Sequence, residues 1–176
     1  MIIPRAVAAL GIAALTACAR PPAPLSAPPS GVRYVAVEQP VNRTGDELVV
    51  DGPGLLQRVL RQDTVTVPDL LAEDLRKVLM QQGFRTPTPG MEDAPVLRTE
   101  IGRWEHYTAN YETVTVDMAA SLVEPATGRE LWKAARTGWV VQTYNAASRR
   151  DASMLASTAI AEALLEGWEA APAPAR

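Results

Sequence analysis

The chain has one cysteine, one histidine and one phenylalanine among its 176 residues. A single cysteine excludes an internal disulfide, so the fold has to be held together by packing alone. The histidine is not part of an HExxH motif, no CxxC pair occurs, and neither phosphate-binding nor dinucleotide-binding glycine motif is present. These absences remove the usual sequence signatures of metalloenzymes and nucleotide-binding enzymes.

The charge balance also lacks any strong bias. The chain carries 17 basic and 20 acidic residues, a net charge of −3, and it has no block of basic residues. A mildly acidic surface without a basic patch disfavours nucleic acid as a partner and disfavours electrostatic binding to a membrane surface. We therefore expect no nucleic-acid partner, and we expect no metal ion either.

The first 17 residues have the composition of a targeting segment. Arg5 supplies the positive charge, and an apolar run of ten residues follows at 6–15. Ten residues are too few to span a bilayer, which needs roughly 20. A positive start, a short apolar run and a small-residue cleavage site are typical of a secretory signal.

The signal ends in Leu15-Thr16-Ala17-Cys18, which resembles the lipobox of bacterial lipoproteins. The resemblance implies that a signal peptidase recognises Leu15, Thr16 and Ala17 and that Cys18 is lipidated and becomes the new N-terminus. A thiol suits thioether formation with a diacylglycerol group, and two or more acyl chains anchor a protein stably. Ala19 is not the aspartate that retains enterobacterial lipoproteins in the inner membrane, so the resemblance favours the periplasmic face of the outer membrane.

Two other interpretations of this segment stay open. One is an ordinary secretory signal in which the cysteine falls by chance, and the other is a single-pass anchor. The small-residue ending and the proline-rich stretch that follows argue against an anchor. That stretch, 19–31, cannot form a helix, and at about 3.1 Å per residue it predicts a tether some 30–40 Å long.

The rest of the chain predicts one domain over 32–169 and a disordered tail at 170–176. One expected helix runs from Pro68 or Asp69 to Gln82, and another from Asp151 to about Trp168. Both have one apolar stripe. A third, short helix is a candidate at 55–62. Apolar and polar residues alternate most clearly at 113–124. The expected strands are 32–39, 84–86, 96–104, 113–124 and 130–141, with a turn-rich segment at 42–54, a connection at 107–112 and a tight hairpin at 125–128.

This order predicts an α+β fold. Two helices with one apolar stripe each have to bury those stripes on the sheet. We expect a two-layer sandwich, with a mainly antiparallel sheet of about four to five strands and both helices on one face. The other face would be wet or would bind a partner.

His106 is the one candidate for acid–base chemistry. A functional interpretation makes it a general base or a pH switch, and a hydrolase would need a nucleophilic serine beside it. None of the candidate serines occurs in a GxSxG elbow. They are Ser121, Ser148, Ser153 and Ser157. The simpler interpretation is a solvated loop histidine, and we expect no catalytic residue and no enzymatic activity.

Aromatic residues are the candidates for binding. Tryptophan and tyrosine suit interfaces because they bury a large area and keep a polar group. Trp132 and Trp139 fit a core of small apolar residues, whereas Tyr107, Tyr111 and Tyr144 fall in expected loops or at strand ends. We take these three tyrosines as the candidate partner-binding residues.

The helix PDLLAEDLRKVLMQQG at 68–83 and the hairpin at 114–134 resemble a group of small bacterial envelope lipoproteins. The hairpin contains the pattern (D/E)-x-x-T-G-x-x-L-W from Glu124 to Trp132. The group includes auxiliary lipoproteins of ABC-type lipid transport systems, the lipopolysaccharide-assembly lipoprotein and the curli-secretion lipoproteins. The resemblance covers 32–168, except that 42–67 has no counterpart.

The resemblance implies a non-enzymatic, membrane-anchored lipoprotein. We expect an accessory or binding subunit of an envelope transport or assembly system, such as ABC-type lipid transport, with a protein partner and no cofactor besides the covalent lipid on Cys18. The alternative is a lipid- or glycolipid-binding chaperone with an apolar groove between helices and sheet.

Overall fold

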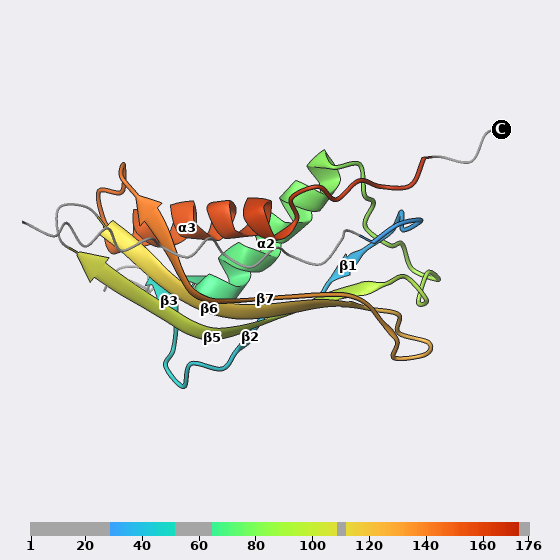
Figure 1. The fold of residues 1–176 in the computed structure, drawn as a ribbon, viewed down its shortest axis with the longest axis horizontal. Coiled ribbons are helices and arrows are strands. Elements are labelled where there is room, and N and C mark those ends of the chain that lie inside the picture. Colours follow the sequence, from blue (N-terminus) through green and yellow to red (C-terminus); the bar gives the residue numbers. More distant parts are fainter. Residues whose placement is uncertain (1–28, 52–64, 109–111, 173–176) are drawn as a thin grey trace, which may run out of the picture.

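The computed structural model describes residues 29–51, 65–108 and 112–172. The strands are β1 (Ala36–Val37), β2 (Val41–Asn42), β3 (Val49–Asp51), β4 (Val65–Thr66), β5 (Val96–Thr108), β6 (Glu112–Val123) and β7 (Glu130–Thr143), and the helices are α2 (Val67–Gln81) and α3 (Arg149–Leu164). Figure 1 shows both helices above the long strands and none below them. The predicted helices-on-one-face α+β sandwich is confirmed.

The main sheet has five strands in the order β1-β5-β6-β7, and β2 pairs with β5 beyond the end of β1. The three long strands β5, β6 and β7 are antiparallel neighbours, whereas β1 and β2 run parallel to β5. The strands β3 and β4 form a separate antiparallel pair. The sheet is therefore mixed, with its antiparallel part in the order that the sequence predicts.

Alternation along β6 explains why this strand is central. Five apolar side chains two residues apart are all buried beneath the helices: Val114, Val116, Met118, Ala120 and Leu122. Successive side chains of a strand point to opposite faces, so the residues between these five lie on the helix-free face. The same alternation continues across the sheet in register, because Leu97 of β5 and Trp132 of β7 both pair with Leu122.

The helix α2 begins and ends where its sequence predicts. The Thr66 hydroxyl accepts a hydrogen bond from the backbone of Asp69, whose carboxylate accepts one from the backbone of Thr66, which completes a capping box. Gly83 then takes a positive φ of 87° just beyond the last turn, a backbone conformation that favours glycine. The helix buries Leu71 and Leu75 completely against the sheet, and each contributes about 2 kcal/mol of apolar transfer free energy.

The helix α3 is different in composition. Its N-cap is Ser148, three residues before the expected Asp151, and the Ser148 hydroxyl accepts a hydrogen bond from the Asp151 backbone at 3.1 Å. The helix ends at Leu164, not at about Trp168 as expected. Most of the residues on its buried face have small side chains. The buried residues are Ala152, Ser153, Ala156, Ser157, Ile160, Ala161 and Leu164. Leu165 and Trp168, beyond the regular helix, continue this face into the core.

Four local expectations need correction. The predicted strand 32–39 is paired as a strand only at β1, and pairing with β5 resumes after Pro40 at β2. The expected strand 84–86 amounts to one parallel bridge between Tyr34 and Arg85. The strand β5 extends to Thr108, so no loop begins at 105–107. The tail is not free at its start, since Ala171 donates a backbone hydrogen bond to Val32 at 2.9 Å.

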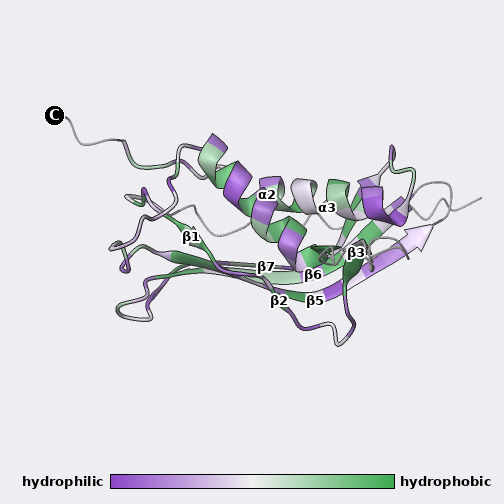
Figure 2. Ribbon diagram, turned by 180° about the vertical axis from the view of Figure 1, so that it is seen from behind, coloured by the Kyte–Doolittle hydropathy of each residue, from purple (hydrophilic) through white to green (hydrophobic). Residues whose placement is uncertain are grey.

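The layer between helices and sheet is filled by side chains. Figure 2 shows apolar residues where the helices and strands face one another. Leu97, Ile101 and Ile160 have no exposed surface. The space between α2 and β1 amounts to about 10 Å³, which is at most one water molecule. The expected helix 55–62 lies outside the described residues.

Candidate functional site

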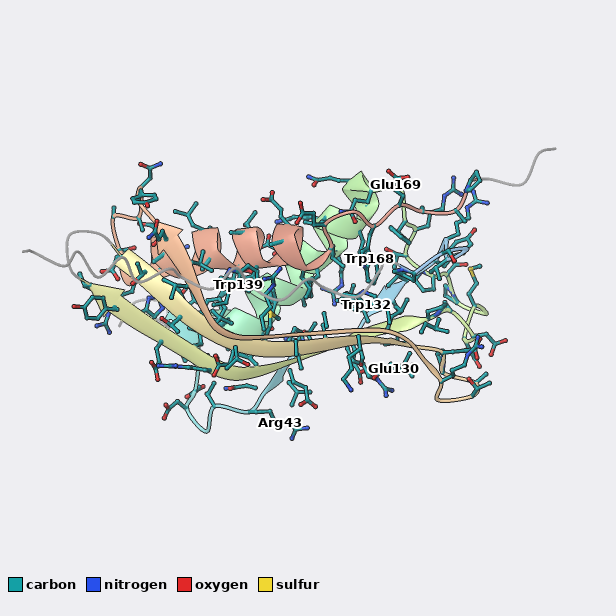
Figure 3. The ribbon with its side chains drawn as sticks, viewed as in Figure 1. Arg43, Glu130, Trp132, Trp139, Trp168 and Glu169 are labelled. Atoms are coloured by element: carbon teal, nitrogen blue, oxygen red, sulfur yellow. The ribbon has the colours of Figure 1, made fainter. Side chains whose placement is uncertain are left out.

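The helix-free face of the sheet divides into two halves of different chemistry. The half next to β1 and β2 is crowded with exposed ion pairs. Their closest atoms lie 2.5–3.4 Å apart in the pairs Arg43–Glu100, Arg98–Glu38, Arg103–Glu105 and Lys133–Glu130. Figure 3 shows Arg43 and Glu130 on the side of the sheet opposite the helices. Exposed pairs of this kind contribute only about 0–1 kcal/mol each to stability, so they define the surface more than they hold the fold.

Small residues line the middle of this charged half. Ala119, Ser121 and Ala135 line two shallow hollows of about 350 and 280 Å³ between the charged side chains. Both hollows share Glu100 and Ala119, so they are continuous across the face of β5 and β6. This part of the sheet is therefore a charged surface with a shallow depression at its centre.

The other half of the face, at the far ends of the long strands, is mostly uncharged, and Glu105 lies at its border in the row that continues through Thr115 to Val140. We call it the tyrosine patch and define it as Tyr107, Thr113, Val140, Gln142 and Tyr144. Tyr107 and Tyr144 are each 66% exposed and Val140 is 53% exposed. Thr113 pairs with both Tyr107 and Gln142, and the Tyr144 hydroxyl donates a hydrogen bond to the Gln142 side chain. The patch is therefore continuous across β5, β6 and β7.

The structure brings two of the three predicted binding tyrosines together and corrects the location of one. Tyr107 lies within β5 and not in a loop. Tyr144 follows the last residue of β7. Tyr111, Cys18 and the 15–17 segment lie outside the described residues. Sequence reasoning missed Val140, although its alternation with buried Val141 could have placed it on the outer face.

The strand β7 is an edge strand. Within the described chain its 14 residues pair with β6 alone, so no other described strand pairs with its outer side. One irregularity interrupts this edge: Gly138 has a φ of 63°, and its N–H donates to the Asp117 carboxylate at 2.5 Å. The edge runs directly alongside the tyrosine patch.

His106 lies on the helix side of β5, in contact with α3. Its Nε2 is 3.1 Å from the Ser153 hydroxyl, which is the serine–histidine spacing that a hydrolase would need. Ser153 is only 3% exposed, however, and His106 Nδ1 has no hydrogen-bond partner among the described residues. The serine is therefore closed off from solvent, and no described residue orients the imidazole as the third member of a triad does.

Burial is the main reason why the pKa of His106 lies below its usual range. The positive charge of Arg149 lowers that pKa further, and the negative charge of Glu112 partly opposes the shift. The imidazole is therefore neutral at pH 7. The sequence-based interpretation of a solvated loop histidine is wrong, because the residue is part of a strand and half-buried under α3.

A third surface feature lies at the opposite end of the domain. An open groove of about 610 Å³ is lined by Val32, Tyr34, Met91, Arg129 and Leu131, next to the point where the described chain begins. Its lining mixes apolar and charged groups of both signs. Within the described residues, no group of three or more metal-ligating side chains occurs, and no helix is long and apolar enough to cross a bilayer.

Comparison with known proteins shows a likeness of fold. No family model matches the chain, and no curated protein matches it in sequence. Among solved structures, the PelC dodecamer from Paraburkholderia phytofirmans aligns with a TM-score of 0.53 at 13% identity, covering 85% of this chain and 97% of that one.

Two further structures align with lower scores. A Xanthomonas campestris protein of the DUF330 family gives a TM-score of 0.49 at 13% identity, covering 81% of this chain and 90% of that one. A lipoprotein of Neisseria meningitidis gives 0.43 at 15% identity, covering 74% and 97%. The similarity to PelC extends over nearly the whole domain of that protein, so the arrangement of helices and sheet is a known one.

Proposed function

We propose that this chain is a non-enzymatic lipoprotein, anchored through Cys18 at the periplasmic face of the outer membrane, that binds a protein partner of an envelope transport or assembly system. The observation that carries the proposal is the tyrosine patch beside the open edge of β7. The lipobox and the proline-rich tether supply the anchor.

The chemistry of the patch suits a protein partner. Exposed tyrosines bury a large area with little loss of conformational freedom, and they are enriched among the residues that dominate interface energies. An open edge strand can accept a strand from the partner through backbone hydrogen bonds. The ion pairs on the neighbouring half of the face then favour a partner of complementary charge pattern.

The alternative of a lipid-binding chaperone needs an apolar groove between helices and sheet. In the described chain that layer is occupied by fully buried leucine and isoleucine side chains. An acyl chain could enter only by displacing several of them, each at a cost of about 2 kcal/mol. The packing therefore favours binding on the outer surface.

Assembly with copies of itself is the other arrangement to distinguish. The PelC structure with the same fold is a dodecamer, which is a property of that protein. A second copy of this chain and a different envelope protein would both contact the tyrosine patch, but the mass of a cross-linked product separates them.

Site-specific photo-cross-linking in intact cells tests the proposal. A photoreactive phenylalanine analogue is placed at Val140, and the matched control carries it at Met80 on α2, which is 65% exposed and far from the patch. The expected result is a discrete adduct with another envelope protein from position 140 that is absent from position 80. Replacing Tyr107 and Tyr144 with alanine is expected to reduce that adduct by about ten-fold or more, since each interface tyrosine contributes 1–2 kcal/mol or more.

Three results would count against the proposal. Equal adducts from both positions would mean random collision, and an adduct that survives loss of both tyrosines would move the binding surface elsewhere. An adduct with the mass of two copies of the chain would replace the partner with self-assembly.

A further inference from the structure

The two halves of α3 are attached to the domain in different ways. The second half and the turn that follows it place large apolar side chains in the core. These are Ile160, Leu164, Leu165 and Trp168. The first half buries only small residues, with two alanines and the hydroxyls of Ser153 and Ser157. The first half therefore removes much less apolar area from water than the second.

The C-terminal attachment is reinforced by aromatic contacts and hydrogen bonds. Trp168 packs edge-on against Trp132 with ring centroids 4.8 Å apart, and against Phe84 at 5.9 Å. Figure 3 shows Trp132 and Trp168 together between the sheet and the helix layer. The side-chain amide of Gln82, at the end of α2, donates to the Leu165 carbonyl at 2.7 Å. This end of α3 is fixed to both the sheet and α2.

The N-terminal half leaves polar groups unsatisfied beneath it. Ser157 Oγ in α3 and His106 Nδ1 on β5 are buried and have no hydrogen-bond partner among the described residues. Each would gain hydrogen bonds with water if the helix lifted, so docking of this half is opposed by their desolvation. The side-chain hydrogen bonds between α3 and the rest of the domain include His106–Ser153 at 3.1 Å, within this half, and Thr158–Asp74 at 3.2 Å, just beyond it.

Charge makes one of these two contacts sensitive to acid. The charged groups that face His106 are Arg149 in the first turn of α3 and Glu112 on β6. The N-terminus of a helix carries a partial positive charge of about half a unit. A protonated His106 would add a cation next to Arg149 at this positive end, in a half-buried position, with Glu112 as the opposing anion.

The helix can move without unravelling. The cap formed by Ser148 and Asp151 is made within the helix itself, and the Thr158 hydroxyl donates a local hydrogen bond to the Met154 carbonyl at 3.2 Å. These bonds do not depend on the sheet. The first half of α3 therefore keeps its own cap when its contacts with the sheet are lost.

We propose that residues 149–157 form an acid-released flap, which leaves the sheet when His106 is protonated while residues 160–168 stay docked. Lifting the flap uncovers the apolar side chains of β6 and β7 beneath it, among them Val114 and Val141. The flap thus converts a fall in pH into a newly exposed apolar surface at the same end of the sheet as the tyrosine patch. The inference does not depend on the proposed function.

The direction of the effect follows from linkage. Docking lowers the affinity of His106 for a proton, so the docked form is fully favoured above the ordinary value of about pH 6.5 and loses stability as the pH falls below it. Each unit by which docking lowers the pKa changes the open-to-docked ratio by about ten-fold in acid.

Hydrogen–deuterium exchange of the full-length protein in detergent tests the flap. Exchange is followed between about pH 8 and about pH 5 and corrected for the intrinsic rate at each pH. Protection of peptides from 149–157 is expected to fall several-fold more in acid than protection of peptides from 160–168. The His106→Gln variant keeps a donor for Ser153 but does not titrate, so its protection is expected to be independent of pH.

The matched control is Thr158→Ala, which removes the Asp74 contact on the other side of α3 and leaves His106 in place. It is expected to keep the pH dependence of the wild type. A parallel loss of protection in both halves of α3 would overturn the inference, and so would an unchanged pH dependence in His106→Gln. If His106→Gln does not fold, the difference in protection between 149–157 and 160–168 of the wild type tests the flap by itself.

Discussion

Replacing Trp168 with alanine is the most demanding test of how this domain is held together. Trp168 is among the largest fully buried side chains, although it lies four residues beyond the end of α3. Its ring connects the segment after α3 to β7 and to the segment after α2, because it packs on Trp132 and on Phe84. The chain has no internal disulfide, so this cluster carries much of the attachment of its C-terminal end.

The expected cost can be worked from these contacts. Removing a buried tryptophan side chain typically lowers the free energy of unfolding by about 3–5 kcal/mol, and loss of the edge-on contact with Trp132 is included in that range. A domain of this size has about 5–15 kcal/mol in total. The melting temperature should accordingly fall by about 10 °C or more.

Urea unfolding followed by circular dichroism measures the change, with Trp139→Ala as the matched control. Trp139 is only partly buried and stacks under Arg136 at 5.0 Å, a contact that contributes about 0.5–1 kcal/mol. The denaturant slope should stay the same in both variants while the midpoint falls much further for Trp168→Ala. Equal midpoints for the two variants would refute the argument that Trp168 anchors the fold.

Three further outcomes follow from the sequence and the structure. Cys18→Ala should release the protein from membranes in a fractionation assay, and continued membrane association would contradict the lipid anchor. Thr66→Ala should lower the free energy of unfolding by about 1 kcal/mol, because it removes the cap of α2. The hydrogen bonds from Thr66 lower the pKa of Asp69, so the stability of the wild type should decline as the pH falls below about 3.8. The stability of the variant should decline less over the same pH range. Gly138→Ala should cost about 1–2 kcal/mol in thermal unfolding, because φ is 63° there, and a neutral result would show that the β7 irregularity is not strained.

Those parts of the fold that follow from local patterns were predictable from the sequence. The period-two alternation of β6 identifies its buried face, and the Thr66 and Asp69 pair identifies the start of α2. Gly128 takes a φ of 70° in the β6–β7 hairpin, as its place in the tight loop predicts. In each case the determining residues lie within a few positions of one another along the chain.

The parts that depend on distant contacts were not predictable. The strand pairing of β1 and β2 is parallel and only two residues long in each, so no alternation identifies it. His106 lies between the polar residues Glu105 and Tyr107 in the sequence. It is half-buried because α3 packs against it, through Ser153, which lies 47 residues later in the chain. The tyrosine patch likewise depends on the register of three strands, which single-sequence patterns do not fix.

The location of the binding surface follows from how the domain uses its apolar residues. Among the described residues, most leucine, isoleucine and tryptophan side chains are buried in the layer between helices and sheet. A ligand that entered this layer would have to replace contacts that hold a domain without disulfides, so binding there and stability would compete. The exposed face of the sheet has no such conflict, since its ion pairs and tyrosines contribute little to folding. A partner can therefore bind Tyr107, Val140 and Tyr144 without loosening the core, and this separation is the physical reason to look for the function on the helix-free face.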